Sequence, residues 1–147
     1  MPVRVAVSDD VDEITAMMHE HADFEGAGSL CHFNREGAAA AMFGDDVTLR
    51  ALIASPLNEP AVTAGVALWY PTFSSWSGST GIWLEDIFVR PAFRGEGLGR
   101  EFLEELRGLT AGRVEWDVQD KNGDAQAFYR RLGANPVPGW TRYRWTL

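Results

Sequence analysis

The chain has 147 residues, of which 46% are hydrophobic and 23% charged, and its formal net charge is −8. This length and composition predict one globular domain, residues 1–147, with its own core. An acidic chain lacks the basic face that a phosphate backbone requires, so we expect no nucleic-acid partner. A single cysteine, Cys31, excludes an internal disulfide and a multi-cysteine metal site, and we expect no metal.

The first residues, MPVRVAVSDD, lack the basic and then apolar pattern of a secretion signal. No apolar run approaches the roughly 18 residues of a membrane span. We therefore expect a cytoplasmic protein without a membrane partner. The negative charge suits a small cationic ligand, although many soluble enzymes of other kinds carry the same charge.

The N-terminal half predicts strands and helices in an irregular order. They are a strand over 3–7, a helix within 8–25, a helix within 34–46, and strands over 47–55 and 61–71. Asn34 is the expected N-cap of the second helix, and Gly44 is its expected end. The polar stretch 72–81 is rich in glycine and serine, which is typical of a loop.

In the C-terminal half, the predicted strands and helices alternate. It predicts a strand over 82–89, a helix over 98–111, a strand over 113–119, a helix over 122–134 and a strand over 141–147. Asn122 or Asp124 is expected to start the last helix and Gly133 to end it. The whole order predicts an α/β (α+β) domain, in which about four helices cover a mixed, mostly antiparallel twisted sheet.

The stretch FRGEGLGR, residues 93–100, joins a predicted strand to a predicted helix through three alternate glycines. It lacks the Lys-Ser/Thr pair of a P-loop, and its spacing differs from the G-x-G-x-x-G pattern of dinucleotide sites. Backbone N–H groups at the helix start, with Arg94 and Arg100 beside them, would suit a diphosphate that is bound but not cleaved. An ordinary glycine-rich turn fits the same residues.

Two motifs in sequence order give the chain a family resemblance. RGEGLG (94–99), directly after the LEDIFV strand, resembles the acyl-CoA motif of the GNAT N-acetyltransferase superfamily, and NGDAQAFYRRLGA (122–134) resembles its second signature. ADFE, YPTFSSWSG and GWTRYR extend the resemblance to the spermidine/spermine (diamine) and thialysine acetyltransferase branch. It implies a GNAT fold with a splay between the strands 82–89 and 113–119. Phe24 and Lys121 depart from the branch, which often has tyrosine at the first position and an aromatic residue at the second.

The resemblance implies a site for acetyl-CoA built largely from main-chain groups. The strand 82–89 would pair with the pantetheine arm like an added strand, and the glycine turn would hold the pyrophosphate. The expected cofactor-binding residues are Ile87, Phe88, Val89, Arg94, Gly95, Glu96, Gly97, Leu98, Gly99, Arg100, Asn122, Ala125 and Tyr129. Asn122 is also a plausible helix cap, and the two roles are compatible.

Tyr129 and Glu85 are the predicted catalytic residues. By the resemblance, Tyr129 would protonate the leaving thiolate, since a phenol with a pKa of about 10 suits a thiol of about 8.5. Glu85 would take the proton of the acceptor amine through a water molecule. From the residues alone, core packing is the favoured interpretation of Tyr129, and Glu85 also fits an ion pair with Arg142 or Arg144.

The expected acceptor-binding residues are Phe24, Glu25, Glu85 and Trp76. Carboxylates would bind an ammonium group, and an aromatic face would add roughly 0.5–2 kcal/mol. We therefore expect an acetyl-CoA-dependent N-acetyltransferase acting by direct attack, in a ternary complex, on a polyamine, a diamine or a lysine-like amino acid. Alternatives are a protein N-terminus or an aminoglycoside as acceptor, or a non-catalytic acyl-CoA-binding module. The branch also implies a homodimer.

Overall fold

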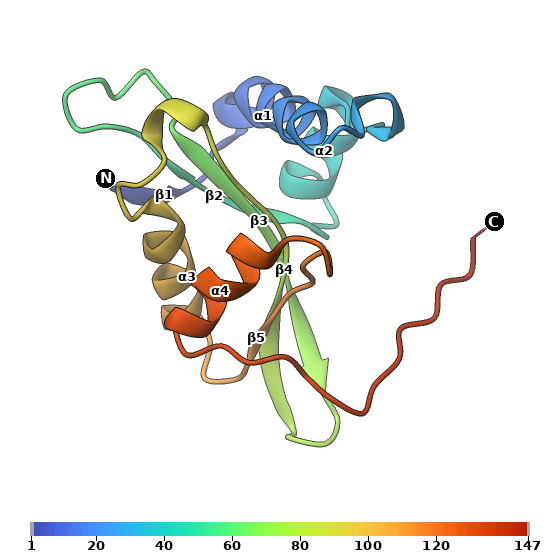
Figure 1. Cartoon of the computed structure of the whole chain (residues 1–147). Coiled ribbons are helices and arrows are strands. Elements are labelled where there is room, and N and C mark those ends of the chain that lie inside the picture. The colour runs from blue at the N-terminus through green and yellow to red at the C-terminus, as the bar shows by residue number, and fades with distance from the viewer. Residues whose placement is uncertain (1, 147) are drawn as a thin grey trace. The chain divides into compact units, whose positions relative to one another are not determined.

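In the computed structural model, which describes residues 2–146, the chain divides into a larger unit up to Trp116 and a smaller unit from Asp117 onward. The larger unit is built on a five-stranded sheet in the order β1-β2-β3-β4-β5 (Figure 1). The first four strands pair antiparallel, and β5 pairs parallel to β4. They are β1 (Val3–Val5), β2 (Arg50–Ala54), β3 (Gly65–Ser74), β4 (Ser79–Val89) and β5 (Val114–Glu115). The predicted mixed, mostly antiparallel sheet is confirmed, and the single domain over 1–147 stays a prediction.

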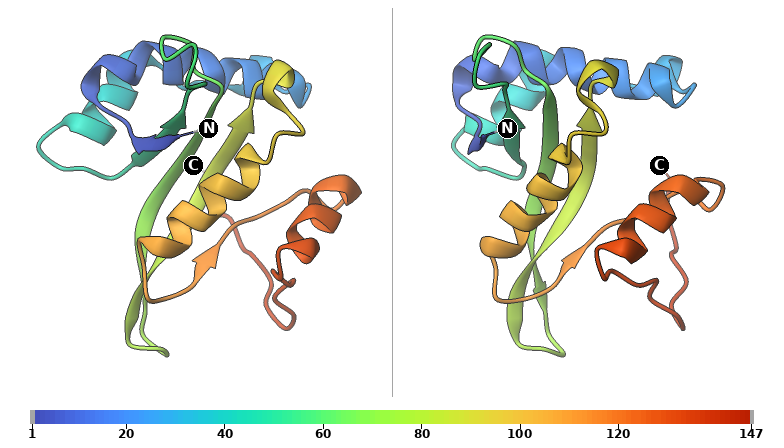
Figure 2. Two further views of the ribbon diagram at one scale, coloured as in Figure 1. Left: turned by 90° about the vertical axis from the view of Figure 1, so that its left-hand side faces the viewer. Right: turned by 60° about the vertical axis from the view of Figure 1, so that its left-hand side comes forward.

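Helices cover both faces of this sheet. The helices α1 (Val11–Phe24) and α2 (Arg35–Phe43) pack on the face that carries Val66, Leu68 and Phe88. The helix α3 (Leu98–Gly108) lies along the opposite face (Figure 2). There a Cβ on Gly65 would approach Phe102 to 3.1 Å, so glycine allows α3 to lie close to the sheet. None of the described helices is long and apolar enough to cross a membrane.

The local signals for helix ends are confirmed. The Asn34 side chain accepts the N–H of Gly37 at 2.8 Å and caps α2. In the smaller unit, α4 (Gly123–Arg131) has Asn122 as its N-cap. The helix is followed by Gly133, which has a φ of 88°. These signals depend on contacts within three or four residues, so they can be read from the sequence.

The stretch 72–81 differs from the predicted loop. β3 runs to Ser74 and β4 starts at Ser79, so the two strands form a long hairpin with its turn at 75–78. Its tip extends away from α1 and α2 (Figure 1). Serine and glycine are tolerated here because the two strands pair through their main chains, which need no particular side chain.

Most predicted elements are somewhat shorter in the structure, and three of those in the C-terminal half are examples: two are shortened and one is missing. The helix 98–111 ends at Gly108, and the strand 113–119 shrinks to Val114–Glu115. No strand forms over 141–146, and Leu147 lies outside the described residues. Alternating aromatics predicted that last strand, but Tyr143 and Trp145 are 93% and 94% exposed. A strand also needs a neighbour to pair with, which alternation alone does not provide.

Arg90, directly after β4, ties the sheet to α1. Its guanidinium donates to both carboxylate oxygens of Glu20, at 2.7 and 2.9 Å, and to the Thr63 carbonyl at 2.9 Å. It also pairs with the Glu13 carboxylate. The hydrogen bonds to Glu20 raise the pKa of Arg90 above its ordinary value, against the opposing effect of burial. The arginine therefore remains charged and holds α1 against the end of β4.

We expect Arg90→Met to lower the free energy of unfolding by about 1–3 kcal/mol, because two partly buried carboxylates lose a charged donor. Urea denaturation measures this loss. Arg35→Met is the matched control, since Arg35 pairs with Asp12 on the surface, where both side chains are more than half exposed. Its loss should stay below about 1 kcal/mol. Equal losses for the two variants would contradict a special role for Arg90.

Candidate functional site

β4 is irregular where β5 leaves it. Leu84 pairs with Trp69 and Asp86 with Leu68, so Glu85 is an extra residue in the strand and forms a β-bulge. The pairing between β4 and β5 covers only Ile82 and Trp83. The rest of β4 therefore runs on past the bulge without the parallel neighbour that its first half has.

The backbone of β4 after the bulge points alternately towards and away from β3. Arg90 N donates to the Ala64 carbonyl at 2.9 Å, so the Arg90 N–H points towards β3 and these two residues form one of the hydrogen-bonded pairs. Because such pairs alternate along an antiparallel ladder, Ile87 and Val89 turn their N–H and C=O groups to the other edge. Val89 O accepts a hydrogen bond there from Arg94 Nε at 2.8 Å. This edge can pair with an extended ligand.

The glycine turn follows directly. Gly95 and Gly97 have φ values of 82° and 86°, and Gly97 is the N-cap of α3. A Cβ at either position would meet no atom within 4 Å, so the left-handed backbone, and not crowding, requires glycine. The first N–H groups of α3 lack acceptors within the helix and suit an anion.

The two arginines beside the turn have different partners. Arg100 donates to Glu104 at 2.7 Å along the exposed side of α3, and this bond raises the pKa of Arg100. Arg94 instead lies over aromatic rings, with its guanidinium carbon 4.2 Å from the ring centre of Phe24 and 5.8 Å from that of Phe88. Arg94, which is predicted to bind the diphosphate, thus contacts Phe24, which is predicted to bind the amine.

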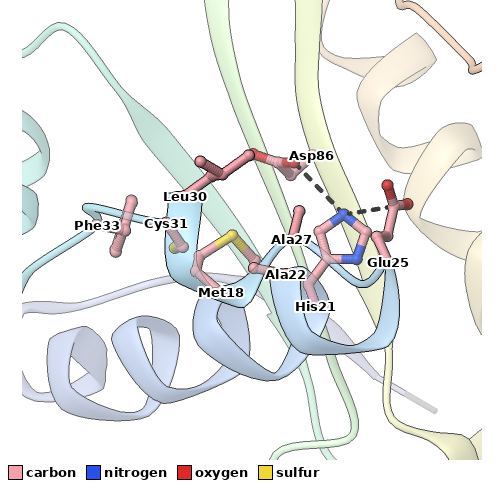
Figure 3. Close-up of a pocket in the computed structure, with 9 residues that line it drawn as sticks. All are labelled: Met18, His21, Ala22, Glu25, Ala27, Leu30, Cys31, Phe33 and Asp86. Atoms are coloured by element: carbon pink, nitrogen blue, oxygen red, sulfur yellow. Dashed lines mark ion pairs between the residues drawn. The ribbon is translucent and has the colours of Figure 1, made fainter.

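A pocket of about 270 Å³ lies next to Phe88, between α1, the segment that follows it and β4 (Figure 3). Its lining residues are Met18, His21, Ala22, Glu25, Ala27, Leu30, Cys31, Phe33 and Asp86. His21 Nε2 lies 3.6 Å from Asp86 Oδ1 and 3.9 Å from Glu25 Oε1. Within residues 2–146, no three side chains of the metal-binding types gather as a metal site.

The sequence analysis named Glu25 but missed Asp86, His21 and Cys31 as pocket residues. Asp86 could have been found, because it is two residues from Phe88 and therefore shares its face of the sheet. His21 and Glu25 are four residues apart on α1 and so share a helix face. Nothing in the sequence indicates that Cys31 lies here.

Three of the four predicted acceptor residues, Phe24, Glu85 and Trp76, lie outside the pocket lining. Glu85 is exposed at the bulge, where its carboxylate accepts the indole N–H of Trp83 at 2.9 Å. Trp76 is 93% exposed at the tip of the β3–β4 hairpin. Of the four, Glu25 lines the pocket, Phe24 lies beside it in the chain under Arg94, and Trp76 lies at the hairpin turn.

The remaining predicted residues belong to α4 in the smaller unit. Asn122 Oδ1 accepts the N–H of Ala125 at 3.1 Å, which confirms the helix-cap role. Ala125 and Tyr129 are one helical turn apart and share a face. The Tyr129 ring lies 5.4 Å from that of Phe128, centre to centre. In the same unit Arg142 pairs with Asp117.

A model of the GNAT acetyltransferase family matches residues 15–134. The chain belongs to the GNAT acetyltransferase family. This GNAT protein is an N-acetyltransferase, which confirms the class of enzyme predicted from the two motifs. The cytoplasmic location and the homodimer stay predictions.

Relatives of this GNAT protein cover most of its length. It is 30% identical to a thialysine N-epsilon-acetyltransferase of Sus scrofa over 97% of this chain and 90% of the relative. It is 37% identical to L-ornithine N5-acetyltransferase NATA1 of Arabidopsis thaliana over 61% of this chain and 41% of that protein. A solved aminoglycoside acetyltransferase, meta-AAC0020, from a soil metagenome shares the fold, with a TM-score of 0.80 at 12% identity over 99% and 95% of the two chains.

Proposed function

We propose that this GNAT enzyme transfers an acetyl group from acetyl-CoA to a primary amine of a small cationic acceptor, such as a polyamine, a diamine or a lysine-like amino acid. The contact between Arg94 and Phe24 carries the proposal, because it joins the glycine turn to the end of α1, where the carboxylate pocket begins. The relatives support the acceptor class, since their names place the acetyl group on a side-chain nitrogen of thialysine or ornithine.

The proposed donor site uses the β4 edge and the glycine turn. The β4 edge at Ile87 and Val89, where Arg94 donates to Val89 O, would hydrogen-bond the pantetheine arm, and the N–H groups from Gly95 to Arg100 would hold the pyrophosphate. The left-handed glycines and the open space around them are compatible with such a ligand. When bound, acetyl-CoA supplies an activated acetyl thioester. Asn122 and Ala125 of the smaller unit keep their proposed role as donor-binding residues.

In the proposed reaction the acceptor nitrogen forms a bond to the acetyl carbon as the carbon–sulfur bond breaks, within a ternary complex. The amine must first lose a proton, which Glu85 would accept through water. Tyr129 would give a proton to the departing sulfur. As the carbon–sulfur bond breaks, the nitrogen loses its second proton to solvent and the Tyr129 phenolate regains one from solvent. Glu85 then releases the proton that it accepted, so one proton is released for each ammonium group acetylated.

The proposed acceptor site lies at the end of α1. Glu25 and Asp86 give the pocket two carboxylates on an apolar lining, which favours an alkylammonium group over a neutral one. The exposed ring of Phe24 adds an aromatic surface beside them. The proposed acceptor role of Trp76 requires the hairpin tip to contribute to binding, because the exposed Trp76 ring lies there.

The test is a panel of amines with acetyl-CoA, in which released CoA is measured by chromatography so that Cys31 does not interfere. Spermidine, diaminopropane, ornithine and lysine analogues should give turnover, and acetylated product should appear in equal amount. N-terminal peptides and aminoglycosides are the competing arms. Turnover confined to either of these would contradict the small-amine proposal.

A further inference from the structure

His21 occupies an unusual position in the acceptor pocket, between two carboxylates from different elements (Figure 3). Its Nε2 faces Glu25 on α1 and Asp86 on β4, at 3.9 and 3.6 Å. Its ring packs against Phe88, with the ring centres 5.2 Å apart. Cys31 lines the same pocket, and Arg94 lies over Phe88. These are the charged and titratable groups that line the pocket with the imidazole or lie over its partner Phe88.

Only one ring nitrogen of His21, Nε2, faces the two carboxylates. The His21 side chain is 21% exposed, and its Nδ1 is buried without a hydrogen-bond partner among the described residues. A doubly protonated ring would thus keep one N–H unpaired, while its other N–H would face the two carboxylates. Histidine is the side chain whose charge changes most readily between about pH 5 and 8.

We propose that His21 is a specificity-determining residue that competes with the acceptor for Glu25 and Asp86. When the imidazole is protonated, it offsets one of the two negative charges and takes the place of the acceptor ammonium group. When it is neutral, both carboxylates attract the cation. This inference rests on the proposed function, because it assumes that the pocket binds a cationic amine.

The proposal concerns acceptor affinity, so it predicts that pH changes KM for the amine much more than kcat. In the wild-type enzyme, KM for the amine should fall by about tenfold or more from pH 5.5 to 8. His21→Gln keeps a polar side chain without the titration, and its KM should vary much less over this range. His32→Gln removes an exposed histidine outside the pocket and should follow the wild type. A His21→Gln profile equal to that of the wild type would overturn the proposal.

A second measurement does not depend on turnover. Cys31 is the only cysteine of the chain and lines the pocket, so a bound amine should slow its alkylation by iodoacetamide. The ratio of rates with and without amine cancels the change in thiolate fraction with pH. Protection should be strong at pH 8 and weak at pH 6 in the wild type, and equal at both in His21→Gln.

The two measurements separate the failure of this proposal from that of the proposed function. Acetylation of amines with an unchanged pH profile in His21→Gln overturns the role of His21 alone. If no amine is acetylated, pH-dependent protection of Cys31 still supports competition by His21. Absent or pH-independent protection in the wild type overturns it. His21→Asn repeats the comparison if His21→Gln proves unstable in urea.

Discussion

Tyr129→Phe is expected to lower kcat by about 10²–10⁴-fold, because the departing thiolate loses its proton donor while the ring is retained. KM for acetyl-CoA should change little, since the substitution removes one hydroxyl group from the surface of α4. Initial rates at saturating amine, together with calorimetric binding of CoA, separate the two effects.

Tyr143→Phe is the control for this variant, since Tyr143 also belongs to the smaller unit and is 93% exposed. Its activity should equal that of the wild type. If Tyr129→Phe turned over as fast as this control, Tyr129 would pack α4 and would have no part in proton transfer. That is the alternative which its helical spacing also allows.

Gly97→Ala is expected to raise KM for acetyl-CoA by roughly 5- to 30-fold, while KM for the amine stays the same. Alanine in the left-handed conformation at this position costs about 1–2 kcal/mol, and shifting the turn to relieve it moves the N–H groups that would bind the pyrophosphate. The free energy of unfolding should fall by a similar amount.

Gly78→Ala is the matched control for this backbone effect. Gly78 also has a positive φ, of 65°, and a Cβ there would likewise meet no atom within 4 Å. It lies in the β3–β4 turn, so its substitution should cost similar stability without changing KM for acetyl-CoA. Equal KM values for the two variants would show that the glycine turn does not bind the donor.

Local signals accounted for much of the fold. The ends of α2 and α4 follow from Asn34, Asn122 and Gly133, because capping depends on neighbours only a few residues away. Strand lengths were less predictable. The stretch 72–81 pairs in spite of its serine and glycine content, and 141–146 forms no strand in spite of its alternation. In both cases the outcome depends on a partner strand, which the sequence of the segment does not contain.

For the candidate site too, some features follow from the sequence and others only from the tertiary structure. The sequence alone determined the family, through RGEGLG and NGDAQAFYRRLGA, and it determined the left-handed turn, because glycines tolerate a backbone that other residues resist. Only the tertiary structure decided which side chains meet. Packing of α1 on β4 places His21 beside Asp86, 65 positions later in the chain, and brings Phe24 under Arg94. Such contacts arise from the bulge at Glu85 and from burial of the α1 face, which are properties of the assembled sheet.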